Sequence, residues 1–157
     1  MMRLRSILWV FALSLVCAQA ALAKDVALIS NKGNNLKGLT FPDLVKICKG
    51  QMGHWPNGRP VTLVTRDPSS PGMHLVLQKV YGMTADEVNN LIIASNHGRS
   101  DHPAIVVVGS DDAVVKKVEA TPGGVGLVDV YSITGGIDVL RVGGKLPLEP
   151  GYVLHGN

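Results

Sequence analysis

Hydrophobic and polar residues along the chain are arranged in a pattern that predicts strands followed by helices. The segment from Arg59 to Tyr81 shows the pattern most fully, because it begins with an apolar run around Leu63 that is typical of a strand. Its second half carries apolar residues at the spacing i, i+3, i+4 and i+7, namely Met73, Val76, Leu77 and Val80. This spacing places them on one face of a helix. The segment therefore predicts a strand that leads into an amphipathic helix, ending at Gly82.

A polar turn joins this strand to this helix, with the sequence Arg66-Asp67-Pro68-Ser69-Ser70-Pro71-Gly72. Pro71 suits the first turn of a helix, where its missing N–H costs nothing, and Ser69 or Ser70 suits the N-cap. A helix N-terminus presents unpaired N–H groups and a partial positive charge. Together with Arg66 and two hydroxyl groups, the turn is a candidate binding site for an oxyanion. The alternative interpretation is an ordinary capped connection between a strand and a helix.

Strands and helices alternate along the rest of the chain. Further strands are expected at residues 26–29, 105–108, 125–130 and 137–142, with a polar loop at 31–35. Further helices are expected after the N-cap residues Thr40, Thr84 and Ser110, the first two with an acidic residue three positions on. This alternation with short connections predicts an α/β layer structure.

The first 23 residues have the features of a secretory signal peptide. Arg3 and Arg5 precede an apolar run from Ile7 to Val16, and Ala21-Leu22-Ala23 has small residues at the two positions that a signal peptidase reads. The run is too short for a permanent membrane anchor. We therefore predict two parts, a cleaved signal peptide at 1–23 and one domain at 24–157, and expect a periplasmic or secreted location.

Charge and cysteine content add little about function. Removing 23 of the 157 residues leaves 134, with 13 basic and 12 acidic side chains, and this near balance suggests no nucleic-acid partner. Cys48 is the one cysteine within residues 24–157, so this part of the chain forms no internal disulfide. It lies on the apolar side of the helix expected after Thr40, where a cysteine usually behaves as a small buried hydrophobe.

Several short motifs follow one another in an order that resembles a known family. They are FPDLVKICKG, WPNGRPVTLVTRD, SPGMHLVLQKVYGMT, HGR and DDAVVKKVEATPGGVGLV. Together they resemble small secreted proteins related to the phosphate-binding (substrate-binding) proteins of ABC transporters, which have the type II periplasmic binding protein fold. The most specific pieces are residues 55–58, similar to the family's W-x-D/N-G, and 121–126, similar to T-P-G-A-I-G. The resemblance covers residues 26–130 and implies a single-lobe domain with a mixed sheet flanked by helices.

The resemblance also implies where an anion would bind. Full-length members hold phosphate between two lobes, and one wall is a turn of the form R-S-D-G-S-G-T. Arg66 matches the arginine of that turn and Ser70 its serine, whereas Asp67 comes one position early and prolines replace two residues that have N–H groups. The resulting expected ligand-binding set is Arg66, Asp67, Ser69, Ser70 and Gly72. The glycine- and serine-rich turn of the first lobe has no match, unless residues 31–35 serve as a reduced version.

Other kinds of chemistry have weaker support in the sequence. His97, Asp101 and His102 lie close together, but their spacing is not a regular zinc pattern, and a solvated loop is the simpler interpretation. Ser69 or Ser70 with His74 lacks a nucleophile elbow and an orienting acid. The glycines at 123, 124 and 126 precede a strand, which is the reverse of the nucleotide-binding order. We therefore expect no enzyme activity, no catalytic residue, no metal and no cofactor.

Two hypotheses about function remain. The first is an exported protein that binds phosphate or another oxyanion at the strand-to-helix turn, with Asp67 accepting the proton of hydrogen phosphate. The second is an envelope interaction or accessory module that keeps the fold, has lost the ligand and binds a membrane transporter, another envelope protein or a second copy of itself. A homodimer would shield a half-site from water.

The signal-peptide prediction has a direct test. N-terminal sequencing of the exported protein is expected to begin at Lys24, because peptidase cleavage should follow Ala23. An uncleaved chain, or one modified with lipid at Cys17, would contradict the prediction.

Overall fold

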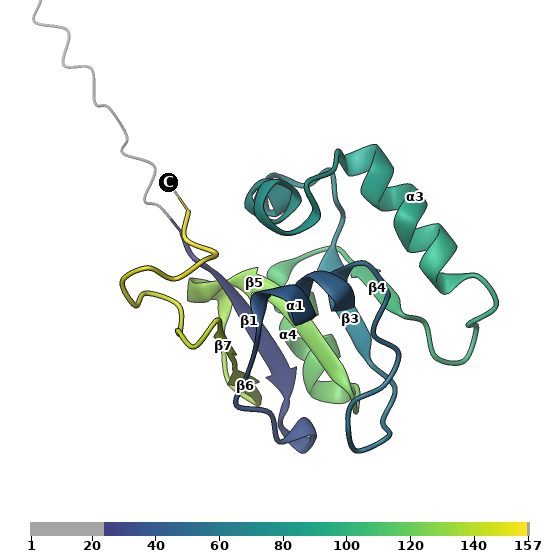
Figure 1. Cartoon of the computed structure of the whole chain (residues 1–157), viewed down its shortest axis with the longest axis horizontal. Coiled ribbons are helices and arrows are strands. Elements are labelled where there is room, and N and C mark those ends of the chain that lie inside the picture. Colours follow the sequence, from purple (N-terminus) through teal and green to yellow (C-terminus); the bar gives the residue numbers. More distant parts are fainter. Residues whose placement is uncertain (1–23, 157) are drawn as a thin grey trace, which may run out of the picture.

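A five-stranded sheet forms the centre of the protein, with the strand order β4-β3-β5-β1-β6 (Figure 1). The structure, a computed structural model, describes residues 24–156, so the predicted signal peptide and Cys17 lie outside the described residues. The five strands are β1 (Val26–Asn31), β3 (Thr62–Arg66), β4 (Ile105–Val108), β5 (Gly124–Asp129) and β6 (Ile137–Val139). A separate pair of short parallel strands consists of β2 (Gly38–Leu39) and β7 (Arg141–Val142).

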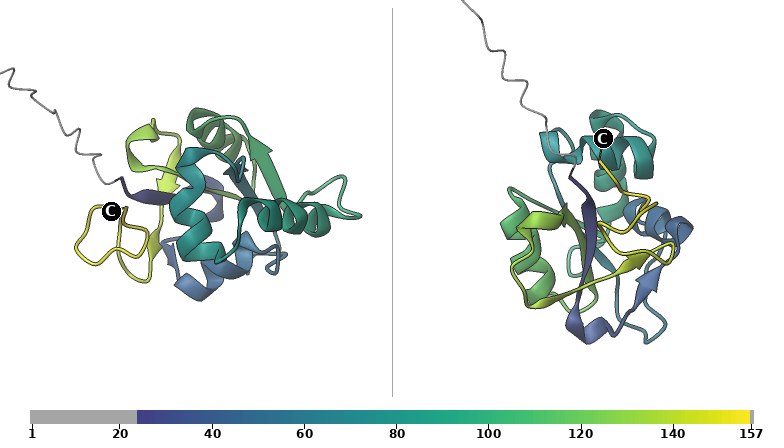
Figure 2. Two further views of the ribbon diagram at one scale, coloured as in Figure 1. Left: turned by 90° about the horizontal axis from the view of Figure 1, so that it is seen from above. Right: turned by 90° about the vertical axis from the view of Figure 1, so that its left-hand side faces the viewer.

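Helices cover both faces of the sheet. One face carries α1 (Phe41–Cys48), a helical segment made of η2 (Pro71–Met73), α2 (His74–Val76) and η3 (Leu77–Tyr81), and α3 (Ala85–Asn96). The other face carries α4 (Asp111–Ala120), and Figure 2 shows α4 and α1 on opposite sides of the strands. Leu63 faces the larger apolar cluster and its neighbour Val64 the smaller one beneath α4, as expected for alternating strand residues. The fold is α/β with a mixed sheet flanked by helices.

The direction of the strands changes across the sheet. β3 runs parallel to both of its neighbours, β4 and β5. β1 runs antiparallel to β5 and to β6. The carboxyl ends of β3, β4 and β5 therefore meet at one edge of the sheet, together with the beginning of β1.

The predicted helix starts are confirmed. The Thr40 side chain accepts a hydrogen bond from the Asp43 N–H at the start of α1, and Ser110 accepts one from Ala113 at the start of α4. Thr84 and Glu87 form a complete capping box at the start of α3. These local signals act within a few residues, and the sequence therefore reveals them without knowledge of the tertiary structure.

The helix expected after the Arg66–Gly72 turn is present, but its winding changes along its length. It begins as a 3-10 turn, continues as a short α-helical piece and ends as a π-helical turn at Tyr81. Ser70 occupies the N-cap position, yet its side chain makes no capping hydrogen bond. Gly82 ends the segment with a left-handed backbone (φ 61°), the conformation that glycine commonly adopts at the end of a helix, as predicted from the sequence.

The strand expected at 137–142 is divided in the structure. Ile137–Val139 pairs with β1 as β6, and Arg141–Val142 pairs with β2 instead. Leu140 lies between them and is buried, while its N–H bonds the carbonyl of Leu28. An apolar run can thus leave one sheet and enter another, and hydrophobic periodicity does not reveal such a change.

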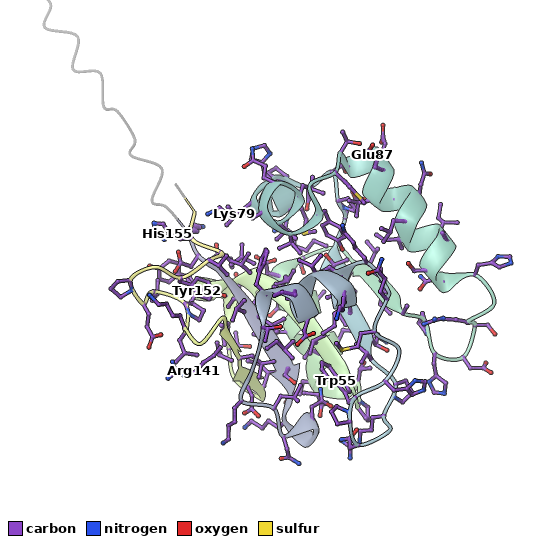
Figure 3. The ribbon with its side chains drawn as sticks, viewed as in Figure 1. Trp55, Lys79, Glu87, Arg141, Tyr152 and His155 are labelled. Atoms are coloured by element: carbon purple, nitrogen blue, oxygen red, sulfur yellow. The ribbon has the colours of Figure 1, made fainter. Side chains whose placement is uncertain are left out.

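The C-terminal segment returns to the start of β1 (Figures 1 and 2). The N–H of Val26 donates to the carbonyl of Leu154, and the Tyr152 hydroxyl donates to the carbonyl of Val26. Figure 3 shows Lys79 beside His155, and the Lys79 ammonium donates to the carbonyls of Val153 and His155. This segment therefore joins the first strand to the 71–81 helical segment.

Cys48 is buried in the larger apolar cluster, as the sequence predicts. Burial raises the pKa of its thiol to about 12. The thiol is therefore protonated at neutral pH and is not an activated nucleophile.

A buried asparagine holds two distant parts of the sheet together. The Asn34 side chain accepts from the N–H of Gly123 and donates to the carbonyl of Gly124 and the hydroxyl of Ser30. It follows β1 and precedes α1, in the loop that the sequence suggested as a reduced first-lobe turn. In the structure this loop contains η1 (Lys32–Asn34) and bonds the start of β5.

Asn34→Ala is expected to lower the free energy of unfolding by about 2–3 kcal/mol, because it leaves a buried N–H and a buried C=O without partners. Urea unfolding monitored by circular dichroism measures the change. Asn90→Ala, on the exposed side of α3, is the matched control and should change stability by less than about 0.5 kcal/mol. Equal effects of the two substitutions would contradict the bracing role of Asn34.

Candidate functional site

Charged side chains gather where the three parallel strands end. Arg66 is the last residue of β3, and Asp129 is the last residue of β5. Asp111 lies shortly after β4, separated from its last residue by two residues. In open α/β sheets, ligands bind beyond the carboxyl ends of strands, where the chain switches from one face to the other. β3 is such a point, because the connection to β4 packs on one face and α4 returns to β5 on the other.

A groove of about 910 Å³ lies at this edge. It is bordered by the start of β1, the end of β3, the helical segment after it, the start of α4 and the C-terminal segment. Its charged lining residues are Lys24, Asp25, Arg66, Lys79, Asp111 and Asp129. Three cations and three carboxylates therefore line the groove, so it has no strong excess of positive charge.

Arg66 is the cation that the end of β3 contributes to this groove. Its Nη1 lies 3.4 Å from Oδ1 of Asp111, and the Ser132 hydroxyl donates to Oδ2 of the same carboxylate at 3.4 Å. The Nε of Arg66 is buried and has no hydrogen-bond partner among the described residues. The guanidinium therefore has donors that the protein leaves unused.

Gly72 supplies the space in which the Arg66 guanidinium lies. A Cβ atom added at Gly72 would overlap Nη1 of Arg66. The backbone of Gly72 has no positive φ, so closeness to the arginine and not backbone conformation makes glycine suitable here. Gly72 and Arg66 come from the two ends of the predicted turn, and the structure brings them into contact.

The other charges of the groove are bonded within the protein. Lys24 pairs with Asp129 at 3.0 Å, and Lys79 bonds carbonyls of the C-terminal segment. The buried Asp25 carboxylate accepts from the Leu148 N–H and lies 2.6 Å from Nδ1 of His155. Arg66 is thus the groove cation with a buried donor that has no partner within residues 24–156.

The residues in the middle of the turn form hydrogen bonds with one another and do not line the groove. Asp67 accepts hydrogen bonds from the Ser69 hydroxyl and N–H, and these bonds lower the pKa of the exposed Asp67 carboxyl. The Ser70 hydroxyl donates to the backbone carbonyl of Asp67. None of the three residues lines the groove.

The structure therefore divides the predicted site residues into two groups. Arg66 and Gly72 line the groove, whereas Asp67, Ser69 and Ser70 form the outer part of the turn. Sequence reasoning missed Asp111, because its position beside Arg66 depends on the pairing of β3 with β4. The sequence also did not reveal Lys79 and Asp25 as groove residues. Both bond to the C-terminal segment, whose return to the start of β1 depends on the tertiary structure.

The loop containing His97, Asp101 and His102 lies away from this groove. Asp101 and His102 border two smaller cavities, of about 350 and 540 Å³. Within residues 24–156, no three His, Cys, Asp or Glu side chains come together as metal ligands would. The helices of the same residues include none with the length and apolar character needed to cross a bilayer.

Comparisons with known proteins identify the fold. The chain matches no protein-family model and no curated protein. Among solved structures it resembles an ABC-type phosphate transport receptor from Vibrio cholerae, with a TM-score of 0.69, 20% identity, and coverage of 85% of this chain and 54% of that one. It also resembles PstS from Borrelia burgdorferi, with a TM-score of 0.65, 19% identity, and coverage of 86% of this chain and 55% of that one.

A phosphate-binding protein from Stenotrophomonas maltophilia gives a TM-score of 0.63 at 18% identity, with coverage of 80% of this chain and 40% of that one. The chain thus has the fold found in phosphate-binding proteins and spans about half the length of the structures it matches, or less. This likeness confirms the fold expected from the resemblance.

Gly72→Ala is expected to displace the Arg66 guanidinium and break its contact with Asp111, because the new methyl group occupies its place. The loss of stability should be about 1 kcal/mol or less, since the displaced atoms are the end of a flexible side chain. The Nε–Hε NMR signal of Arg66 reports the displacement. Gly53→Ala, at a glycine with open space around it, is the control. An unshifted Arg66 signal in Gly72→Ala would contradict this arrangement.

Proposed function

We propose that the chain is an exported, non-enzymatic protein that binds an oxyanion such as hydrogen phosphate, with Arg66 as the anchoring residue. The observation that carries the proposal is the Arg66 guanidinium, which lines an open groove and contacts Asp111 through a single approach of 3.4 Å at Nη1. A planar guanidinium suits oxyanions, because it presents pairs of parallel N–H donors.

The surroundings of Arg66 support the same proposal. Lys79 lines the groove and adds positive potential to it, since its ammonium bonds backbone carbonyls, whereas the charge of Lys24 is offset by Asp129. The strand-end position is the one where open α/β sheets bind ligands. The fold neighbours are described as phosphate transport or phosphate-binding proteins, which makes phosphate the first ligand to test.

The five residues expected from the sequence would take different parts. Arg66 would give the charge-assisted hydrogen bonds, and Gly72 would keep its guanidinium in place. Asp67, Ser69 and Ser70 would contact the anion only after exchanging their present hydrogen bonds within the turn. Asp67 would then serve as the acceptor for the proton of hydrogen phosphate.

Two observations favour a second candidate function, an interaction module without a ligand. The groove carboxylates of Asp25, Asp111 and Asp129 balance its cations, which lowers its attraction for an anion. In addition, the chain spans about half the length of its fold neighbours. Such a module would bind a transporter or another envelope protein, and a homodimer remains a prediction.

Isothermal titration calorimetry at low salt, with phosphate and with sulfate, distinguishes the two. Phosphate should bind saturably to residues 24–157, and Arg66→Ala should weaken binding by about 1.5–3 kcal/mol, the range for hydrogen bonds to charged groups. Arg66→Lys should restore part of the loss, since lysine keeps the charge without the planar donors.

Arg99→Ala is the matched control, because it removes the same charge from an exposed loop outside the groove. Phosphate affinity that is equal in Arg66→Ala and the unchanged protein would rule out this site. A flat titration with both anions would favour the interaction module.

A further inference from the structure

The carboxylate of Asp111 already occupies one side of the Arg66 guanidinium. The pair is shielded from water in part, since the side chains of Arg66 and Asp111 are 23% and 16% exposed. Water screens such a pair less than it screens an ion pair on the open surface. Asp111 therefore reduces the positive potential that an anion from solution would meet at Arg66.

Asp111 also has a fixed place in the fold. It is the first residue of α4, and the Ser132 hydroxyl donates to its second carboxylate oxygen. Because Asp111 belongs to the same chain, its effective concentration at Arg66 is far above that of a dissolved anion. A dissolved oxyanion must therefore displace the carboxylate or bind beside it against like-charge repulsion.

The contact between Asp111 and Arg66 is weak enough to be displaced. It is a single approach of 3.4 Å, whereas charge-assisted N–H···O bonds are typically about 2.7–2.9 Å and often paired. The other two groove carboxylates are engaged elsewhere, Asp129 with Lys24 and Asp25 with the C-terminal segment. Asp111 is therefore the groove carboxylate that faces the anchoring arginine.

We propose that Asp111 is an intramolecular competitor that sets the oxyanion affinity of the groove by occupying the Arg66 guanidinium. This inference rests on the proposed oxyanion-binding function and concerns its regulation. It makes the protein a low-affinity binder that responds to high oxyanion concentrations. Any change that moves the start of α4 away from the end of β3 would raise the affinity.

The test is calorimetric titration of phosphate and sulfate into residues 24–157 and into Asp111→Asn and Asp111→Ala. Removing the carboxylate is expected to raise the association constant about tenfold for phosphate and for sulfate alike. Asp111 competes with and repels both anions through their negative charge, and the proton that hydrogen phosphate carries has no part in this effect. The alanine variant is needed because the asparagine amide could itself donate a hydrogen bond to an anion.

Asp112→Asn is the matched control. It removes the same charge from the same helix turn, but Asp112 is exposed, lies outside the groove and pairs with Lys116 at 2.9 Å. Its anion affinity should stay within about twofold of the unchanged protein. Thermal unfolding of all variants shows that they are folded, and both substitutions remove a comparable helix-dipole contribution.

Each pattern of results decides between the two proposals. Phosphate binding that is the same with and without Asp111 overturns the competitor and leaves the proposed function standing. Binding that appears only in the Asp111 variants supports the competitor and rejects oxyanion binding by the unchanged protein. No binding in any variant overturns both. Loss of phosphate binding together with gain of sulfate binding would show that Asp111 accepts the ligand's proton, which also overturns the competitor.

Discussion

The pairing of β3 with parallel strands on both sides is the constraint on which the candidate site depends. Because β4 and β5 run in the same direction as β3, the carboxyl ends of all three strands meet at one edge. Arg66, Asp111 and Asp129 come from these ends, although they are far apart in sequence. A reversal of any one strand would move its charged residue to the other edge, and the groove would lose its arginine or one of its carboxylates.

The sequence allowed the prediction of features that short stretches determine. The caps at Thr40, Thr84 and Ser110, the end of the central helix at Gly82 and the burial of Cys48 follow from neighbouring residues, and the structure confirms them. The resemblance also predicted the single-lobe fold. Strand order and the division of residues 137–142 between two sheets depend on distant partners, so periodicity could not reveal them.

The same distinction explains which residues of the groove the sequence pointed to. Arg66 and Gly72 belong to one short turn that the sequence singles out, although only the structure shows that the guanidinium lies beside the glycine. Asp67, Ser69 and Ser70 were grouped with them because of their polar atoms, yet an aspartate two residues before a serine readily bonds it within the turn. Asp111 becomes a neighbour of Arg66 only through the parallel pairing of β3 and β4.

The Arg66–Asp111 pair also limits what the arginine alone implies about a ligand. A partly buried guanidinium without a nearby carboxylate is costly, because it loses hydration that nothing replaces. Asp111 lowers this cost, so the fold tolerates Arg66 whether or not an anion ever binds. The presence of the arginine therefore agrees equally with a binding protein and with an interaction module. Asp111 contacts Nη1 and leaves the buried Nε without a hydrogen-bond partner among the described residues. Because the buried Nε is not reached from the groove, an oxyanion would bind at the Nη groups, where it meets the Asp111 carboxylate, and the affinity of the groove therefore depends on how readily Asp111 is displaced.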